Sequence, residues 1–175
     1  MAKTSKKQIE LDENKVIDHL QKNCMENLDS FAKTCGFSRQ KVWRIIKNLE
    51  RDQSIWGYTA VINPESIQKK HYVLLMKRNM QKINERITDL LLSRQFEEVV
   101  SKLNITIETS SYTHGEYDWI ATFLAPNIIY AKKFSELVKT TYPDTFQRIE
   151  LLETLFDIKR QNIANPNAKK IKELL

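Results

Sequence analysis

Residues 35–50 read CGFSRQKVWRIIKNLE, and they indicate a helix-turn-helix in the first part of the chain. Gly36 stands where one helix ends, because glycine accepts the left-handed backbone that a helix end requires. Ser38 is the predicted N-cap of the next helix. After it, apolar side chains recur at i, i+3, i+4 and i+7, the spacing of one buried helix face: Val42, Ile45, Ile46 and Leu49.

Two further helices are predicted ahead of this one. The first is marked by Val16, Ile17 and Leu20, with Asp12 as its N-cap and Glu13 in its first turn. After a polar break at residues 23–27, the second is marked by Phe31, Ala32 and Cys35 and is capped by Asn27 or Asp29. Three helices joined by tight turns form a minimal packed unit, so residues 9–53 are predicted to be a helix-turn-helix domain, winged-helix-like in type.

The face of the third helix opposite its apolar stripe is cationic. Residues 28–47 hold five basic residues against one acid, whereas residues 71–175 hold fifteen against thirteen. Arginine and glutamine side chains fit guanine and adenine edges, and lysine fits phosphates. One interpretation is the solvated side of an amphipathic helix; the one we favour is a recognition helix in the major groove of DNA. The predicted DNA-binding residues are Arg39, Gln40 and Arg44 at bases, Lys33, Lys41, Lys47 and Arg51 at phosphates, and Ser38 and Trp43 beside them.

The second half of the chain alternates strand and helix. A strand or extended linker at 54–63 ends at Asn63-Pro64, and residues 54–70 are assigned to a linker strand. The pattern then predicts strands at 71–78, 105–113, 117–124 and 146–158, a turn at 114–116, and helices at 80–103 (broken near Arg94) and 127–141. The inward residues of the last helix are predicted to be Ile128, Ala131, Phe134, Leu137 and Val138. The order β-α-β-β-α-β is that of a ferredoxin-like domain, so the fold class is α+β. Residues 161–175 are a basic tail, predicted to be a loose helix or disordered.

The composition and motif content indicate the kind of partner and argue against a membrane protein, a metalloprotein and an enzyme. The net charge of +6 favours an anionic partner. There is neither a long apolar run nor a signal-like start, which predicts a cytoplasmic protein without a membrane span. Two cysteines and three scattered histidines lack the spacing of a metal site, and no phosphate-binding glycine loop or catalytic triad order is present. We therefore expect no metal, no cofactor and no enzymatic activity.

Several motifs together resemble the Lrp/AsnC family of transcriptional regulators. They are Leu49-Glu50 at the end of the third helix, IWGYTA at 55–60, Asn63-Pro64, and Gly115-Glu116-Tyr117-Asp118 in the predicted hairpin. The resemblance covers about residues 9–160, although the segment 80–104 is longer than is usual in the family. It implies that residues 71–160 form an effector-binding and oligomerisation domain.

The same resemblance implies partners. It predicts a homodimer or a larger homo-oligomer such as an octamer, a near-palindromic operator in double-stranded DNA, and a small effector of the amino-acid type. Gly115, Tyr117 and Asp118 are the expected effector-binding residues. Two alternatives remain at this stage. The first is an enzyme, because siroheme decarboxylases are built on the same architecture; His114 is then the candidate residue beside the tetrapyrrole. The second is a metabolite-sensing module whose helix-turn-helix docks a protein instead of DNA.

Overall fold

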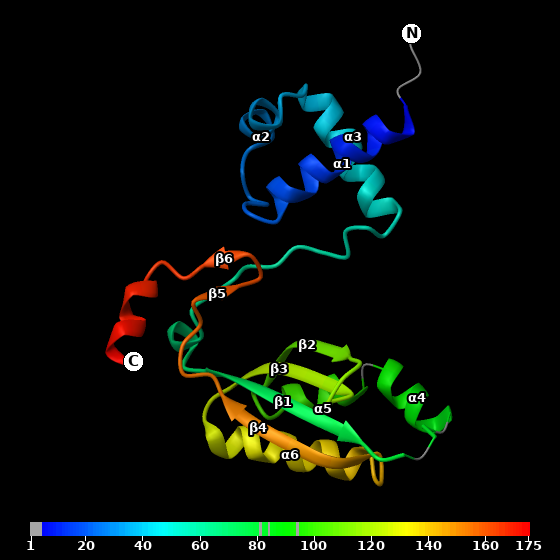
Figure 1. Cartoon of the computed structure of the whole chain (residues 1–175), viewed down its shortest axis with the longest axis vertical. Helices are drawn as coiled ribbons and strands as arrows, with labels where there is room; N and C mark the ends of the chain where they lie inside the picture. Colours follow the sequence, from blue (N-terminus) through cyan, green and yellow to red (C-terminus); the bar gives the residue numbers. More distant parts are fainter. Residues whose placement is uncertain (1–4, 81, 84, 94) are drawn as a thin grey trace. The chain divides into compact units, whose positions relative to one another are not determined.

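The computed structural model describes residues 5–80, 82–83, 85–93 and 95–175. The chain divides into two compact units (Figure 1). Unit 1 consists of Met1–Val61 together with Asp157–Leu175, and unit 2 consists of Ile62–Phe156. Within the described residues, no helix has both the length and the apolar character needed to cross a membrane.

Unit 1 begins with three helices around a small apolar core. They are α1 (Lys6–Leu20), α2 (Leu28–Cys35) and α3 (Arg39–Arg51). The core consists of Val16, Phe31, Ala32, Cys35, Val42, Ile45 and Leu49. The stripe predicted for the third helix is thus confirmed, with Ile46 partly buried at its edge.

The turn between α2 and α3 is also as predicted. Gly36 ends α2 with a φ of 69°, in the left-handed region. The Ser38 Oγ accepts a hydrogen bond of 3.2 Å from the main-chain nitrogen of Lys41, which caps α3. At the other end of α2 the cap is Asn27, whose side chain accepts hydrogen bonds from the nitrogens of Asp29 and Ser30.

The predicted start of α1 is wrong. The helix begins at Lys6 with Ser5 as its N-cap, so Asp12 lies in its middle and is 7% exposed. The first two turns carry exposed apolar side chains, Ile9 and Leu11, and therefore show no buried stripe from which the helix could be recognised.

The linker and the following turn contain no strand. Of the two alternatives for residues 54–63, the structure has the extended one without strand pairing. A short 3-10 helix, η1 (Pro64–Ile67), follows, with the Asn63 side chain as its cap.

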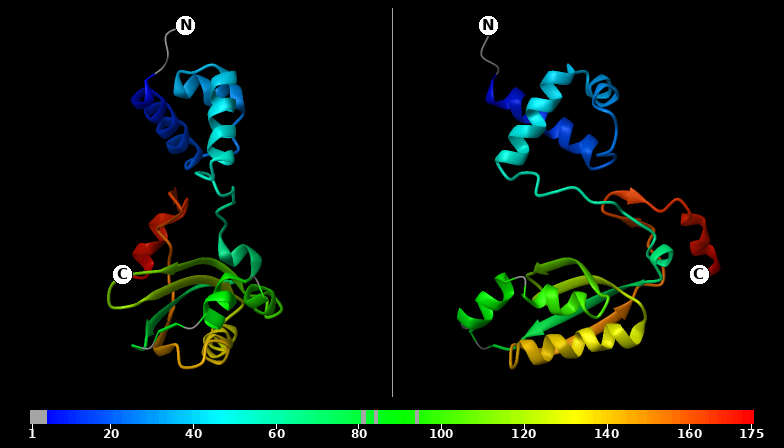
Figure 2. Two further views of the ribbon diagram at one scale, coloured as in Figure 1. Left: turned by 90° about the vertical axis from the view of Figure 1, so that its right-hand side faces the viewer. Right: turned by 180° about the vertical axis from the view of Figure 1, so that it is seen from behind.

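Unit 2 is a four-stranded antiparallel sheet with helices on one face. The strands are β1 (Lys70–Arg78), β2 (Thr106–Tyr112), β3 (Trp119–Ala125) and β4 (Phe146–Glu153), in the order β2-β3-β1-β4. This confirms the ferredoxin-like plan. The right-hand view of Figure 2 shows α6 (Ile128–Thr141) lying across the sheet. Its Ala131, Phe134 and Val138 pack on Tyr72, Leu74, Met76 and Phe123.

Three details of unit 2 differ from the predictions. The helical segment predicted at 80–103 with a break near Arg94 is two helices, α4 (Glu85–Leu92) and α5 (Gln95–Ser101), so it starts later than predicted, and Arg94 itself lies outside the described residues. Ile128 was expected to face inward but is 39% exposed; it is the first residue of α6, and the first residue of that helix in the core is Ala131. The last strand ends at Glu153, before the predicted 158.

Residues 157–175 are more regular than the sequence suggested. A short hairpin joins β5 (Lys159–Arg160) to β6 (Ile163–Ala164), and a 3-10 helix, η2 (Ala168–Glu173), follows. Strands of two residues are too short to show an alternating pattern in the sequence.

Candidate nucleic-acid interface

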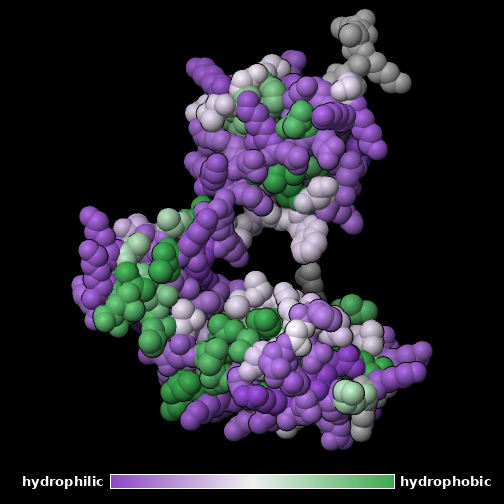
Figure 3. Space-filling model, in the orientation of Figure 1, coloured by the Kyte–Doolittle hydropathy of each residue, from purple (hydrophilic) through white to green (hydrophobic). Residues whose placement is uncertain are grey.

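Helix α3 separates its apolar and cationic residues onto opposite sides. Val42, Ile45 and Leu49 are buried in the core of unit 1. The side chains of the other face are exposed: Arg39, Gln40, Arg44, Lys47 and Arg51, with Trp43 beside them at 56% exposure. Ser38 and Lys33 are exposed as well, on the turn and on α2. The surface seen in Figure 3 over the three helices is mainly hydrophilic.

Two of the predicted DNA-binding cations, Arg44 on α3 and Lys33 on α2, have no partner within the described part of the chain. Arg44 and Lys33 make neither a hydrogen bond through their side chains nor an ion pair there, and the same holds for the Gln40 amide. Their donors are therefore available to an external acceptor. Arg44 lies one turn along from Gln40, so both project from the same side of the helix.

Three other cations are paired with carboxylates, of which Asp29 and Asp52 are exposed and Glu50 is partly buried. Arg39 lies 3.6 Å from Asp29, Lys47 lies 2.7 Å from Glu50, and Arg51 lies 3.0 Å from Asp52. The exposed pairs, Arg39–Asp29 and Arg51–Asp52, contribute little to stability because solvent screens them. A phosphate can therefore replace the carboxylate at little cost.

Lys41 differs from the other cations, because its partner is buried. Its Nζ lies 2.6 Å from an oxygen of Asp12 and 4.0 Å from the centre of the Phe37 ring. The Gln8 amide donates a further hydrogen bond of 3.0 Å to the same carboxylate. The hydrogen bond from Lys41 holds the pKa of Asp12 below its usual value, against the opposing effect of burial. This pair ties α1 to the first turn of α3.

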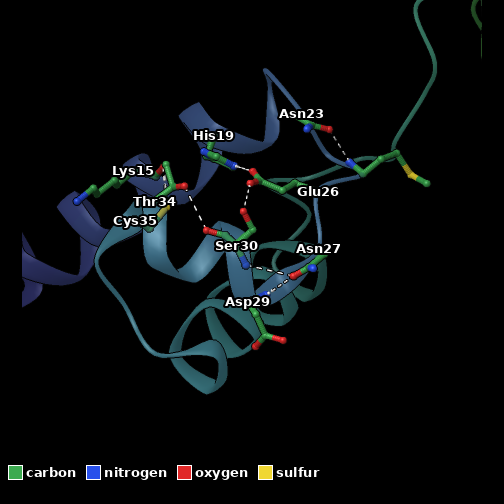
Figure 4. Close-up of polar contacts among 10 residues, drawn as sticks. Lys15, His19, Asn23, Glu26, Asn27, Asp29, Ser30, Thr34 and Cys35 are labelled. Atoms are coloured by element: carbon green, nitrogen blue, oxygen red, sulfur yellow. Dashed lines mark hydrogen bonds and ion pairs between the residues drawn. The ribbon is translucent and has the colours of Figure 1, made fainter.

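A second polar cluster joins α1 to the start of α2 (Figure 4). The His19 ring is hydrogen-bonded to Glu26 and stacks on Phe31 with 4.2 Å between the ring centres. Ser30 donates a hydrogen bond of 2.5 Å to the other oxygen of Glu26. Hydrogen bonds from Ser30 and His19 lower the pKa of Glu26. The cluster fixes the loop between the two helices and so supports the position of α2 beneath α3.

The three predicted effector-binding residues lie together at the β2–β3 turn of unit 2. Asp118 accepts a 2.8 Å hydrogen bond from the main-chain nitrogen of Arg78. Tyr117 donates a 2.5 Å hydrogen bond to Glu150, and this bond raises the pKa of Tyr117. Gly115 is exposed with a φ of 154°, which favours glycine. Asp118 and Tyr117 therefore both have structural partners in this state.

No metal site emerges from the described residues, since no three His, Cys, Asp or Glu side chains gather there. The two cysteines are free thiols, and burial raises the pKa of Cys35. Its sulfur lies 3.9 Å from the main-chain oxygen of Lys15, a contact between α1 and α2 (Figure 4). His114 is exposed in the β2–β3 turn.

Comparison of the whole chain with known proteins gives structural matches only. No protein family model and no curated protein matches the sequence. A transcriptional regulator of Neisseria meningitidis, solved in complex with L-methionine, matches at 18% identity over 99% of this chain and all of its own, with a TM-score of 0.63. An AsnC family regulator of Agrobacterium tumefaciens matches at 21% identity over 85% of this chain and 92% of its own, with a TM-score of 0.64. The chain has the fold of AsnC-type transcriptional regulators.

Escherichia coli AsnC itself is another of these matches. It aligns at 16% identity over 88% of this chain and 96% of its own length, with a TM-score of 0.52. The AsnC-type fold thus accounts for both units of the chain, although few residues are shared.

Asp12, which was predicted to cap the first helix, instead pairs with Lys41 of the candidate interface. It is a buried residue in the middle of α1 that forms an ion pair with Lys41 of α3, and it does not cap the helix. A signal was present, because Asp12 precedes the core residue Val16 by four positions and so shares its helix face. A carboxylate on the core side of a helix predicts a buried cation partner.

Proposed function

We propose that this chain is a sequence-specific DNA-binding transcriptional regulator. The observation that carries the proposal is that α3 has two faces of opposite character. Its apolar face is buried, whereas Arg39, Gln40 and Arg44 are exposed in its first turns. The first turns of the second helix of a helix-turn-helix are those that reach base edges in the major groove. The fold shared with AsnC-type regulators supports the same function.

The active form is proposed to be a homodimer or a larger oligomer. The sheet face of unit 2 opposite the helices carries an apolar band, in which Leu75 pairs with Ile120 and Val73 with Leu152. Figure 3 shows apolar side chains gathered over this sheet. An antiparallel sheet with one free face normally carries polar residues there, so the band favours a second copy as its cover. A two-fold dimer then reads a near-palindromic operator, with half-sites about 34 Å apart.

Two variants of α3 test the DNA-binding proposal. Arg44→Ala is expected to cost about 1–3 kcal/mol on the operator and to relax specificity at one base pair, because a bidentate base contact is lost. Lys47→Ala is expected to weaken operator and random duplex alike and to reduce the salt slope by about 1. The operator comes from genome-wide selection of bound fragments, and affinities from fluorescence anisotropy between 50 and 300 mM salt, about the range in which phosphate contacts respond.

The two variants serve as controls for each other. Equal losses on operator and random duplex for Arg44→Ala would remove Arg44 from the set of base contacts. If the unaltered protein does not bind duplex DNA even at low salt, the DNA-binding proposal itself is wrong. The alternative is a helix that docks a protein, for which the exposed indole of Trp43 is the apolar anchor.

A small-molecule effector of the amino-acid type is the second part of the proposal. Its support is the resemblance of the β2–β3 turn to the family pattern, together with the L-methionine held by the Neisseria regulator. The proposed contacts are an ammonium on the Asp118 carboxylate, which also accepts the hydrogen bond from Arg78, and a close approach of the ligand to the main chain at Gly115. An effector must bind the free protein and its DNA complex with different affinities. Calorimetry with the twenty amino acids, with and without operator, tests this, and no heat from any of them would refute it.

A further inference from the structure

Unit 1 carries a second cationic element besides α3. Residues Asp157–Leu175, named here the C-terminal arm, contain five basic residues against two acids, Asp157 and Glu173. The basic residues are Lys159, Arg160, Lys169, Lys170 and Lys172. Neither the helix-turn-helix nor the ferredoxin-like domain requires them.

The arm is held in a defined conformation by its own hydrogen bonds. Asn165 is central, because its main-chain nitrogen donates to the oxygen of Ile158 at 2.9 Å and its amide donates to the oxygen of Asp157 at 2.8 Å. The Asn165 side-chain oxygen also accepts a 2.8 Å hydrogen bond from the nitrogen of Asn167. These bonds close the β5–β6 hairpin and lead the chain into η2.

Three lysines of η2 are free of internal partners. Lys169, Lys170 and Lys172 are exposed, and within the described residues they make no side-chain hydrogen bond or ion pair. A 3-10 helix has three residues per turn, so Lys169 and Lys172 project from one side of η2. Arg160, in contrast, lies 3.8 Å from Asp157 and is mostly buried. The positive charge that the arm offers to a partner is therefore concentrated on η2.

The arm also belongs to the same folded unit as the recognition helix. An open cavity of about 770 Å³ is lined jointly by Ile17 and Leu20 of α1, by the linker at Trp56 and Tyr58, and by the arm at Gln161 and Ile163. The hairpin tip at this cavity is formed by Gln161 and Asn162, both with positive φ and both exposed. Lysines and side-chain amides are the groups that contact the sugar-phosphate backbone.

We propose that the C-terminal arm is a second DNA-contacting element, which binds backbone phosphates through Lys169, Lys170 and Lys172. The inference rests on the proposed DNA-binding function and extends it. An acidic protein surface offers the same charge, but duplex DNA is favoured because the arm is part of the unit that presents α3. Since phosphates carry no sequence information, the arm adds affinity and salt dependence without altering base preference.

The test replaces the three lysines together by glutamine, K169Q/K170Q/K172Q, in the full chain. The matched control is K102Q/K132Q/K139Q, which removes the same charge from exposed lysines of unit 2. Affinity for operator and for random duplex is measured across a salt series, and light scattering reports the oligomeric state. The slope of the logarithm of the DNA association constant against the logarithm of the salt concentration is negative, and for the first variant its magnitude is expected to decrease by about 3 per arm on both duplexes. The ratio of operator to random affinity stays the same, and the control slope changes by less than about 1.

The outcomes separate this inference from the proposed function. If the unaltered protein binds operator and both variants have the same slope, the arm does not contact DNA and only this inference is overturned. If the arm variant changes the oligomeric state while its slope stays that of the control, the arm contacts a protein surface and the inference is again overturned. Failure of the unaltered protein to bind any duplex at low salt overturns both.

Discussion

Asp12 links the stability of the three-helix core of unit 1 to the position of α3. The carboxylate is nearly buried, accepts hydrogen bonds from Gln8 and Lys41, and belongs to α1, whereas Lys41 belongs to α3. The Lys41 ammonium also lies over the Phe37 ring, where it makes a cation–π contact. Lys41 thus serves as a structural cation, unlike Lys47, which is itself exposed and pairs with the partly buried Glu50.

Asp12→Ala is expected to lower the free energy of unfolding by about 1.5–3 kcal/mol, the usual worth of hydrogen bonds to a charged group. Urea unfolding followed by circular dichroism measures the loss. Asp18→Ala, an exposed carboxylate of the same helix, is the control and is expected to change stability by less than about 0.5 kcal/mol. Equal effects of the two substitutions would show that the Asp12–Lys41 pair does not stabilise the head.

The pH dependence of this stabilisation has a defined sign. The pKa of Asp12 is lowered in the folded protein, so its contribution is fully present above the unfolded-state pKa of about 3.9. It is lost as the pH falls through the lower, folded-state pKa. The difference in stability between the unaltered protein and Asp12→Ala should therefore be constant above about pH 5 and shrink below about pH 4.

At the scale of elements, the turn between α2 and α3 sets the geometry of the helix-turn-helix. Gly36→Ala should destabilise unit 1 by about 1–2 kcal/mol, because the left-handed φ of 69° is costly for a residue with a Cβ. Space does not add to the cost, since the nearest atom to an added Cβ is the flexible end of Lys15 at 4.0 Å. Thermal unfolding followed by circular dichroism measures the loss of stability of the Gly36→Ala protein.

Gly57→Ala provides the matched comparison for that substitution. Gly57 lies in the extended linker, its φ is outside the left-handed region, and an added Cβ would meet nothing within 4 Å. Its replacement should alter stability by less than about 0.5 kcal/mol. A Gly36→Ala protein as stable as Gly57→Ala would contradict the role assigned to the turn.

The elements that could be predicted from the sequence were those with a local signal. Ser38, Gly36 and the Val42–Leu49 stripe specify α3 through capping, backbone freedom and periodicity, all within a few residues. The start of α1 gave no such signal, because Ile9 and Leu11 are exposed. In the candidate nucleic-acid interface too, only the features with a local signal could be predicted. The exposure of Arg44 follows from helix periodicity, whereas the partner of Lys41 depends on how α1 packs on α3.

At the scale of the whole molecule, the apolar band on the sheet of unit 2 predicts the site of subunit association. Leu152→Glu is expected to convert a dimer into monomers, because it places a charge where Leu152 (48% exposed) and Val73 are neighbours. Size-exclusion chromatography with light scattering measures the change. The control is Leu92→Glu, on α4 away from that face, which should leave the mass unaltered. An unaltered dimer with Leu152→Glu would exclude this face as the interface.

Unit 1 is assembled from both ends of the chain, with unit 2 encoded between Val61 and Asp157. During synthesis the ribosome therefore releases α1, α2 and α3 first, and the strands from Asp157 onward only after all of unit 2. A newly made chain that already has α3 still lacks the lysines of η2. If those lysines contact DNA as proposed, a nascent chain that is still bound to the ribosome has a lower affinity for DNA than the finished, released protein.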